Sequence, residues 1–415
     1  MTAGPVAWSA ERLDWTDEPL GEIGLPKGTM RLRSGFGSGL STRPGDPPGI
    51  VWAIGDRGPN LKVKAAAKLY GVEGLERLRD VEGAKIMPRP DLGPALARLR
   101  IADGRVEIVG GFRIADGRGR PVSGLPIPGG PHISCEPAFG LDGAPLDSDP
   151  SGLDTEGVAA LPDGGFWVGD EFGPSLVRLG PDGRVAVRLV PEGVALEGAA
   201  YPVEARLPAI AARRQINRGF EAVALSPDGS ALFLAFQSPL AHPDEQAHER
   251  GRHVRLWRLD PATGEVTAQF LYPLDPPEAF RRDRAKGPLG WSDLKVSELC
   301  FAGPGSLLVL ERGSETTKIY SVSPSEGFEL DPSHLDPATR PTVEQLSARD
   351  EGPGLPVLAK RLLLSTDEAP DIPADLEGMA ILSPSELLLV NDNDFGVEGG
   401  ATSFWRIRFD RPVLV

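Results

Sequence analysis

Residues 154–171 read Asp-Thr-Glu-Gly-Val-Ala-Ala-Leu-Pro-Asp-Gly-Gly-Phe-Trp-Val-Gly-Asp-Glu, and the same order of residue types recurs three more times along the chain. Each copy has an acidic residue, a small apolar run, a turn containing Pro, a second apolar run and a polar cluster. The other copies are residues 220–237, 297–312 and 376–392. Two apolar runs joined by such a turn are typical of a β-hairpin. The sequence therefore predicts four related hairpins.

The spacing of the copies predicts how these hairpins are arranged. The glutamates at their starts are separated by 65, 77 and 79 residues, which is typical of a β-propeller whose blades carry loop insertions. A weaker copy, residues 35–57, lacks the glutamate. We also expect a short helix near 61–79 and a further blade containing 99–113. We therefore predict an all-β fold, a single β-propeller domain over residues 1–415 with six blades, five or seven blades being the alternatives.

The composition restricts the partners of the protein. The formal charge of −15 would repel nucleic acid, and no window approaches the ~20 apolar residues needed to cross a bilayer. We expect a monomer that binds a small, anionic substrate. Residues 1–15 show no basic region followed by an apolar one, so we expect no signal peptide there, and the sequence leaves the localisation open.

Residues at equivalent strand ends converge on the central channel of a propeller, because the innermost strand of every blade lines it. We expect four glutamates to share one position and to act as general bases or metal ligands: Glu156, Glu221, Glu298 and Glu377. The other expected metal ligands are Asp170, Glu171, Glu311, Asn391, Asp392 and Asp394. The expected substrate-binding residues are Asp56, Arg57, Arg218, Gln237 and Arg312.

So many carboxylates in one narrow channel would raise each other's pKa values unless cations neutralised them. The available ligand atoms are all oxygen, which favours Ca²⁺, then Mg²⁺ or Mn²⁺, over Zn²⁺. Each acidic residue could alternatively cap a turn or accept a backbone hydrogen bond, but four glutamates in register favour a channel site. The arginines are equally consistent with binding an anionic substrate and with pairing to the carboxylates.

Several motifs, taken together, resemble a known family. They are Gly55-Asp-Arg-Gly-Pro-Asn60, Glu156-Gly-Val-Ala, Phe166-Trp-Val-Gly-Asp-Glu-Phe-Gly-Pro-Ser175, Asn217-Arg-Gly-Phe-Glu221, Gln237-Ser-Pro-Leu240, Leu310-Glu-Arg312, Glu377-Gly-Met-Ala and Asn391-Asp-Asn-Asp-Phe-Gly396. With these residues the chain resembles the bacterial phytase-like domain family, also described as having the esterase-like activity of phytase. The resemblance covers nearly the whole chain. It implies a propeller, an acidic central site and a hydrolase, and members of the family are frequently exported.

The leading hypothesis from the sequence is a metal-dependent hydrolase that acts on phosphoric or other esters in the central channel. Two alternatives accompany it. One is a noncatalytic propeller that binds a metal, a sugar or a peptide in the same channel, and the other is a lactonase-type hydrolase.

Overall fold

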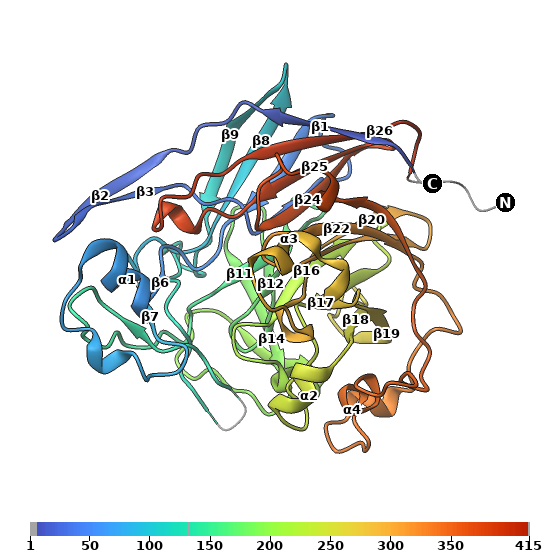
Figure 1. Cartoon of the computed structure of the whole chain (residues 1–415). Coiled ribbons are helices and arrows are strands. Elements are labelled where there is room, and N and C mark those ends of the chain that lie inside the picture. Colours follow the sequence, from blue (N-terminus) through green and yellow to red (C-terminus); the bar gives the residue numbers. More distant parts are fainter. Residues whose placement is uncertain (1–5, 131–132, 414–415) are drawn as a thin grey trace.

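The computed structural model describes residues 6–130 and 133–413, and its regular structure is mostly β-strand. Within these residues, five sheets of four or five strands form the blades of a propeller (Figure 1). Blade 1 consists of β4 (Gly39–Ser41), β5 (Ile50–Ile54), β8 (Ala95–Ala102) and β9 (Arg105–Arg113). Blade 2 consists of β11 (Thr155–Ala160), β12 (Phe166–Asp170), β13 (Ser175–Leu179), β14 (Val185–Pro191) and β15 (Val203–Leu207).

The remaining three blades have four strands each. Blade 3 consists of β16 (Phe220–Leu225), β17 (Leu232–Phe236), β18 (His253–Leu259) and β19 (Val266–Pro273). Blade 4 consists of β20 (Lys295–Gly303), β21 (Ser306–Arg312), β22 (Thr317–Val322) and β23 (Lys360–Ser365). Blade 5 consists of β24 (Leu376–Ser383), β25 (Glu386–Asn391), β26 (Phe404–Phe409) and β1 (Trp8–Leu13).

The inner strands of the blades form a closed ring. β4, β11, β16, β20 and β24 contact one another in this order, and β24 also contacts β4. The ring is completed by both ends of the chain, because β1 pairs antiparallel with β26, from Trp8 opposite Phe409 to Leu13 opposite Phe404. This pairing connects the first strand of the chain to the last blade of the propeller. The predicted all-β propeller is confirmed.

The prediction of six blades is not confirmed, because the segment expected to hold the extra blade is used in two other ways. Residues 99–113 fall in β8 and β9, which pair onto β5 and so extend blade 1. The rest of the segment contributes to a side lobe, which we define by β2 (Pro19–Leu25), β3 (Gly28–Arg33), β6 (Leu61–Lys62), α1 (Val63–Tyr70), η1 (Glu76–Leu78), β7 (Lys85–Ile86) and β10 (Ala138–Phe139). Its two-residue strands are too short for a blade. The predicted helix near 61–79 is confirmed as α1.

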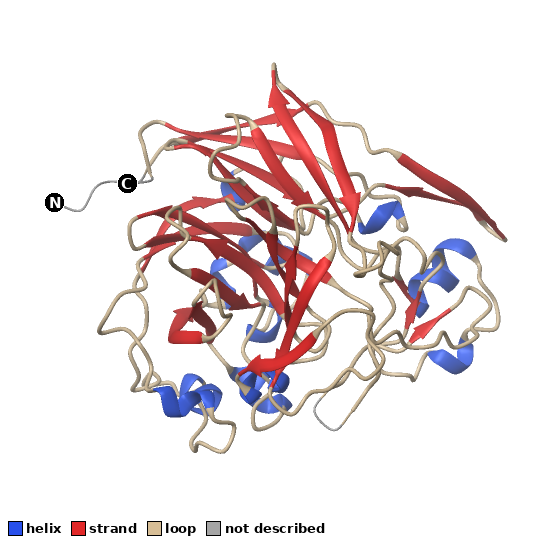
Figure 2. Ribbon diagram, turned by 180° about the vertical axis from the view of Figure 1, so that it is seen from behind, coloured by secondary structure: helices blue, strands red, loops and turns tan. Residues whose placement is uncertain are grey.

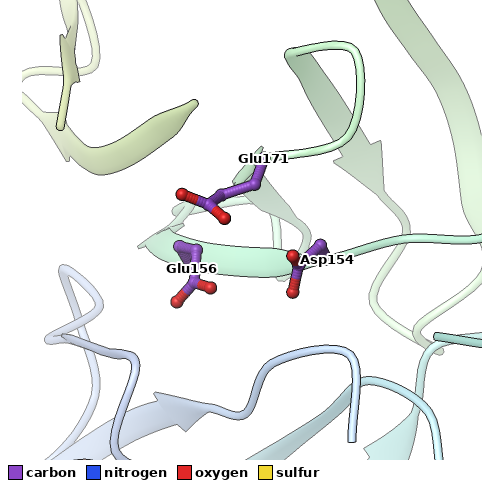
Figure 3. A group of neighbouring side chains, drawn as sticks. All are labelled: Asp154, Glu156 and Glu171. Atoms are coloured by element: carbon purple, nitrogen blue, oxygen red, sulfur yellow. The ribbon is translucent and has the colours of Figure 1, made fainter. Parts of the chain in front are cut away.

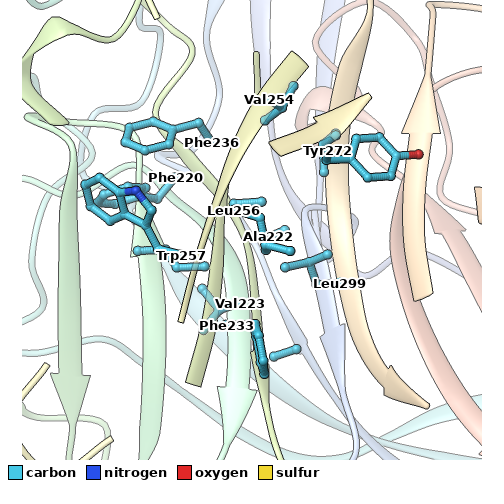
Figure 4. Close-up of a cluster of buried hydrophobic side chains, with 14 of the residues drawn as sticks. Phe220, Ala222, Val223, Phe233, Phe236, Val254, Leu256, Trp257, Tyr272 and Leu299 are labelled. Atoms are coloured by element: carbon cyan, nitrogen blue, oxygen red, sulfur yellow. The ribbon is translucent and has the colours of Figure 1, made fainter. Parts of the chain in front are cut away.

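The hydrophobic core lies between the blades. Strand β17 reads Leu-Phe-Leu-Ala-Phe and is buried at every position, as expected for a strand with a neighbouring sheet against both faces. The largest apolar cluster extends from blade 2 across blade 3 to blade 4. In Figure 4, Phe220, Phe236 and Trp257 lie together on one side of this cluster, and the ring centroids of Phe236 and Trp257 are 5.0 Å apart. This packing holds the inner strands at fixed distances from the channel.

The remaining helices lie in the connections between strands (Figure 2). The α-helices are α2 (Glu245–Arg250), α3 (Arg281–Lys286) and α4 (Val343–Ser347). The 3₁₀ turns are η2 (Ala209–Arg213), η3 (Pro277–Ala279), η4 (Trp291–Asp293), η5 (Pro332–Leu335), η6 (Thr366–Glu368) and η7 (Asp394–Gly396). The long insertion that carries α4 is attached to blade 3 by a buried ion pair, with Arg255 Nε 2.7 Å from Glu344 Oε1.

Candidate functional site

Blades 2 to 5 pair their two inner strands with the same local geometry. In each blade, one pair of opposed residues is followed by a register shift, which marks a β-bulge on the inner strand. The opposed pairs are Thr155 with Asp170, Phe220 with Phe236, Val296 with Glu311, and Leu376 with Asn391. Because the shift falls at the same place in every blade, it aligns the four blades residue by residue.

Three positions of this alignment lie at the central channel. The first position precedes the opposed pair on the inner strand and holds Asp154, Gly219, Lys295 and Asp375. The second position follows the pair on the inner strand and holds Glu156, Glu221, Ser297 and Glu377. The third position follows the pair on the second strand and holds Glu171, Gln237, Arg312 and Asp392. Most of these residues line one cavity of about 320 Å³.

This central cavity is strongly polar. Its further lining residues are Asp56, Arg57, Asn60, Lys62, Lys85, Asn217 and Asp394. In all, eight carboxylates and five cationic side chains line it. Ten of the residues predicted from the sequence are brought together here: Asp56, Arg57, Glu156, Glu171, Glu221, Gln237, Arg312, Glu377, Asp392 and Asp394.

Glu298 is the predicted glutamate that does not line the cavity. The register shift places Ser297, and not Glu298, at the position of Glu156 and Glu221. The Glu298 carboxylate is fully buried and accepts hydrogen bonds from the backbone N–H groups of Leu40, at 2.9 Å, and Leu299, at 3.0 Å. Burial raises its pKa well above the ordinary value. Glu298 therefore connects blade 4 to blade 1, and its expected equivalence to the other glutamates is corrected by one residue.

Three expected metal ligands also lie away from the cavity: Asp170, Glu311 and Asn391. They belong to the opposed pairs, and neighbouring residues of a strand point to opposite faces. Asp170 pairs with Arg188, with 2.6 Å between Oδ2 and Nη2, and both side chains are fully buried. Glu311 accepts hydrogen bonds from Tyr272 and Lys360, and Asn391 accepts one from Ser403. These groups stabilise the blades behind the channel.

The most compact acidic group belongs to blade 2. Asp154, Glu156 and Glu171 each offer one carboxylate oxygen, and these three atoms lie within 4.8 Å of one another (Figure 3). Arg57 Nη2 lies 2.6 Å from Asp154 Oδ2 and 3.7 Å from Glu171 Oε2. Burial raises the pKa values of Asp154 and Glu156 well above their ordinary values. We name this group the blade 2 triad.

Asp154 was not among the predicted site residues, although the sequence contains a signal for it. It precedes Glu156 by two residues, and Asp375 precedes Glu377 in the same way. Residues two apart on a strand share a face. The Asp-x-Glu pattern in two of the four copies therefore indicated a second acidic position beside the glutamate.

A second acidic group lies between blades 5 and 1. Burial raises the pKa of Asp56 to about 7, although the nearby Arg57 opposes this shift. Burial and the neighbouring charges of Asp394 and Asp56 raise the pKa of Asp392 well above its ordinary value. Like charges that interact in this way destabilise one another unless a cation lies between them.

The opposite side of the cavity is cationic and is supplied by blade 4. The Arg312 guanidinium pairs with Glu377 and lies 3.1 Å from Asp375 Oδ1. Lys295 also lines the cavity, and the positive charge of Arg312, together with burial, lowers the pKa of Lys295 to about 8. Arg218 does not line the cavity but donates a 3.0 Å hydrogen bond to Gln237. Lys295 was also not among the predicted site residues, because the position that it shares with Asp154 was not recognised as part of the channel.

A family model described as "Phytase-like: Esterase-like activity of phytase" matches residues 33–395. The chain belongs to this phytase-like family. A fungal relative, an uncharacterised secreted protein of Arthroderma benhamiae, is 26% identical over 317 residues, which are 68% of this chain and 59% of that protein. The chain thus spans less than two thirds of the length of this relative. The expected bacterial origin is not confirmed, since the relative is fungal.

Solved propellers resemble the phytase-like chain only distantly. A PQQ-bound aldose sugar dehydrogenase of Streptomyces coelicolor is 13% identical with a TM-score of 0.34, covering 98% of this chain and 100% of its own. A gluconolactonase of Xanthomonas campestris is 10% identical with a TM-score of 0.35, covering 98% of both chains. A calcium-binding regucalcin of Agrobacterium tumefaciens is 14% identical with a TM-score of 0.35, covering 99% and 97%. These values support no inference about function.

Two residues that line the cavity, Arg57 and Glu221, each have a buried atom without a hydrogen-bond partner among the described residues, Nε in Arg57 and Oε2 in Glu221. Glu221 Oε1 accepts a hydrogen bond from Gln237, whereas Glu221 Oε2 has no such partner. Burial, with the charges of Glu171 and Glu377, raises the pKa of Glu221 well above its ordinary value. A buried polar atom without a partner is costly, so the Glu221 Oε2 atom is available to a bound ligand or water.

In the described part of the chain, no helix is long and apolar enough to cross a membrane.

Proposed function

We propose that the phytase-like chain is a metal-dependent hydrolase that cleaves an ester of an anionic substrate in the central cavity. One observation supports this most strongly. The same three blade positions hold Asp154, Glu156 and Glu171 in blade 2 but Lys295, Ser297 and Arg312 in blade 4. One side of the cavity is thus built for a cation and the other for an anion.

The blade 2 triad fits a hard divalent cation. It supplies three carboxylate oxygens within 4.8 Å of one another, and Ca²⁺ favours several oxygen ligands of this kind. We propose Ca²⁺, with Mg²⁺ or Mn²⁺ as the alternatives, held by Asp154, Glu156 and Glu171. When bound, the ion supplies Lewis-acid polarisation of the ester and offsets the carboxylate charge. Asp392 and Asp394 line the same cavity and offer further ligand oxygens.

The remaining residues of the cavity have two proposed roles, which are substrate binding and proton transfer. Lys295 and Arg312 bind the negative charge of the substrate, because ammonium and guanidinium groups form strong hydrogen bonds to phosphate or carboxylate oxygens. Arg218 holds Gln237 at 3.0 Å, and Gln237 in turn fixes one oxygen of the Glu221 carboxyl. We assign Glu221 Oε2 as the acceptor of the proton from the attacking water.

The experiment measures turnover of the purified protein with added Ca²⁺ on phytate, a simple phosphate monoester, a carboxyl ester and a sugar lactone. We expect release of phosphate or alcohol that is lost on chelation. Glu221→Gln should lower turnover by about a hundredfold or more. Glu298→Gln is the matched control, because Glu298 lies outside the cavity, and its turnover should be unchanged.

The same experiment discriminates the alternatives. If the protein binds Ca²⁺ or a substrate but turns over none of the substrates, the protein is a noncatalytic binding propeller and the hydrolase proposal is wrong. Turnover of uncharged lactones without turnover of phosphate esters would move the assignment to a lactonase. We also propose that the protein is exported, which is supported by the description of its fungal relative as secreted and is tested by fractionation. We further propose that it is a monomer, which is tested by light scattering.

A further inference from the structure

A second cavity lies in the side lobe, next to the propeller ring. It has a volume of about 780 Å³, within the range of small-molecule sites. Its lining comes from the segment that runs through α1 to β7, together with Glu136. The lining residues are Lys62, Val63, Lys64, Ala67, Lys68, Leu78, Arg79, Val81, Gly83, Ala84, Lys85 and Glu136. We name this cavity the lobe groove, and Figure 1 shows its elements α1, β6 and β7 grouped beside the ring.

The lobe groove is basic in a strongly acidic protein. Five cationic side chains line it against one carboxylate, Glu136, whereas the chain carries a net charge of −15. Among the described residues, four of these cations have no carboxylate oxygen within 4.0 Å: Lys62, Lys64, Lys68 and Arg79. The acidic residues of the same segment, Glu73, Glu76, Asp80 and Glu82, do not line the groove. Cations gathered without counter-charges repel one another, so an anion between them is favourable.

Helix α1 adds to this positive potential. Lys64, Ala67 and Lys68 lie on the face of α1 that lines the groove, since residues three and four apart are neighbours on a helix surface. The N-cap residue, Lys62, makes no side-chain capping hydrogen bond. The backbone N–H groups of the first turn are therefore not satisfied by a cap, and the helix dipole places partial positive charge at the same end.

The lobe groove adjoins the central cavity. Lys62 and Lys85 line both of them. Glu136 connects the two as well, with Oε1 3.6 Å from Lys85 Nζ and Oε2 2.7 Å from Arg57 Nη1. An anion bound in the groove would therefore lie beside the central cavity, with Lys85 and Glu136 between them.

We propose that the lobe groove binds an anionic group, phosphate or carboxylate, on the part of the substrate remote from the reacting ester. The substrate is then a small molecule with at least two anionic groups. The link to turnover rests on the proposed function, whereas anion binding in the groove does not. The groove is the size of a small-molecule site and the rest of the chain is acidic, which favours a compact anion over an extended polyanion.

The experiment measures binding of inorganic pyrophosphate and of citrate by calorimetry, in chelator, so that neither probe binds through Ca²⁺. We expect Lys64→Gln/Lys68→Gln to bind the preferred probe about tenfold more weakly than the wild type, because two charged hydrogen-bond donors are lost. The control is Lys27→Gln, which removes a lysine of the same lobe that does not line the groove. Preference for pyrophosphate identifies a phosphate site and preference for citrate a carboxylate site.

Equal affinities of the wild type and the double variant would overturn the proposal, including the case in which the probe binds Lys295 and Arg312 instead. An equal loss in Lys27→Gln would also overturn it, because net charge alone would then explain the binding. Thermal melting of all variants shows that they are folded. Probe binding that depends on Lys64 and Lys68, in a protein without ester turnover, would keep the groove and overturn the proposed function. Ester turnover without probe binding that depends on Lys64 and Lys68 would support the proposed function and overturn the groove.

Discussion

Blades 2 and 4 have the same backbone geometry at the channel and carry opposite charges there. The register shift aligns Asp154 with Lys295, Glu156 with Ser297, and Glu171 with Arg312. Between them, blade 3 carries Gly219, Glu221 and Gln237 at these positions. The repeated backbone thus supplies equivalent positions around a channel, and the side chains that differ from blade to blade give the cavity an acidic side in blade 2 and a basic side in blade 4.

The opposed pairs immediately behind these positions carry an acidic residue in both blade 2 and blade 4. Asp170 and Glu311 are equivalent and both are acidic. Asp170 pairs with the fully buried Arg188 in blade 2, and Glu311 pairs with the partly buried Lys360 in blade 4. Charge is therefore balanced within each blade one residue behind the cavity. The imbalance at the cavity itself is what a ligand would offset.

The largest effect is expected at this position behind the channel. Asp170→Ala leaves the fully buried Arg188 without its carboxylate, and removal of one partner of a buried ion pair costs about 3–5 kcal/mol. We expect a loss of this size in the free energy of unfolding, measured in urea. Asp182→Ala, at an exposed ion pair of the same blade, is the control and should change it by less than about 1 kcal/mol. A loss in Asp170→Ala as small as that expected for Asp182→Ala would contradict a structural role for Asp170.

The next largest effect is expected at the acidic side of the cavity, which the blade 2 triad forms. Glu156→Gln/Glu171→Gln removes two charges of the blade 2 triad, and Ca²⁺ affinity depends strongly on the number of carboxylates. We expect the Kd for Ca²⁺, measured by calorimetry, to rise by roughly a hundredfold or more. Glu298→Gln should leave this Kd unchanged, because Glu298 does not line the cavity. A similar loss in Glu298→Gln would restore the register expected from the sequence.

The position of Glu298 is the part of the site that could not be predicted from the sequence alone. The repeats indicated the propeller, the channel and ten of its lining residues, because hairpins with polar ends leave a clear pattern. The one-residue shift in blade 4 leaves no such pattern. From the sequence alone, either Ser297 or Glu298 could be aligned with Glu156 and Glu221. The blade number was missed for a related reason, because the apolar runs of 95–113 do not show that they pair onto β5.

The alternation behind the channel could have been predicted in principle. Asp170 and Glu171 are neighbours on an extended segment and must point to opposite faces, so both could not be ligands of one site. What the sequence does not show is the partner of each residue. Arg188 lies on β14 and Lys360 on β23, and only the folded sheet brings these strands beside the carboxylates.

A smaller effect is expected from pH. The pKa of Asp56 is raised to about 7 from 3.8, so the folded state retains a proton that the unfolded chain loses. Its contribution to stability is therefore largest below pH 4 and is lost as the pH rises towards 7. In chelator we expect the Tm to fall between pH 5 and pH 8, with a smaller fall in Asp56→Asn. A Tm that rises over this range would contradict the burial of charged groups at the cavity.

The smallest effect is expected when blade 4 is made to resemble blade 2. Lys295→Asp places a carboxylate at the position of Asp154, so it should strengthen Ca²⁺ binding and weaken binding of an anionic substrate, each severalfold, since single charge contacts contribute about 1 kcal/mol. Lys295→Gln removes the cation without adding the acid and should change only the KM for the substrate. The contrary result is an equal change in KM in both variants with no change in the Kd for Ca²⁺ in either. The electrostatic field of blade 4 would then not reach the Ca²⁺ ligands of blade 2, and the two sides of the cavity would act independently.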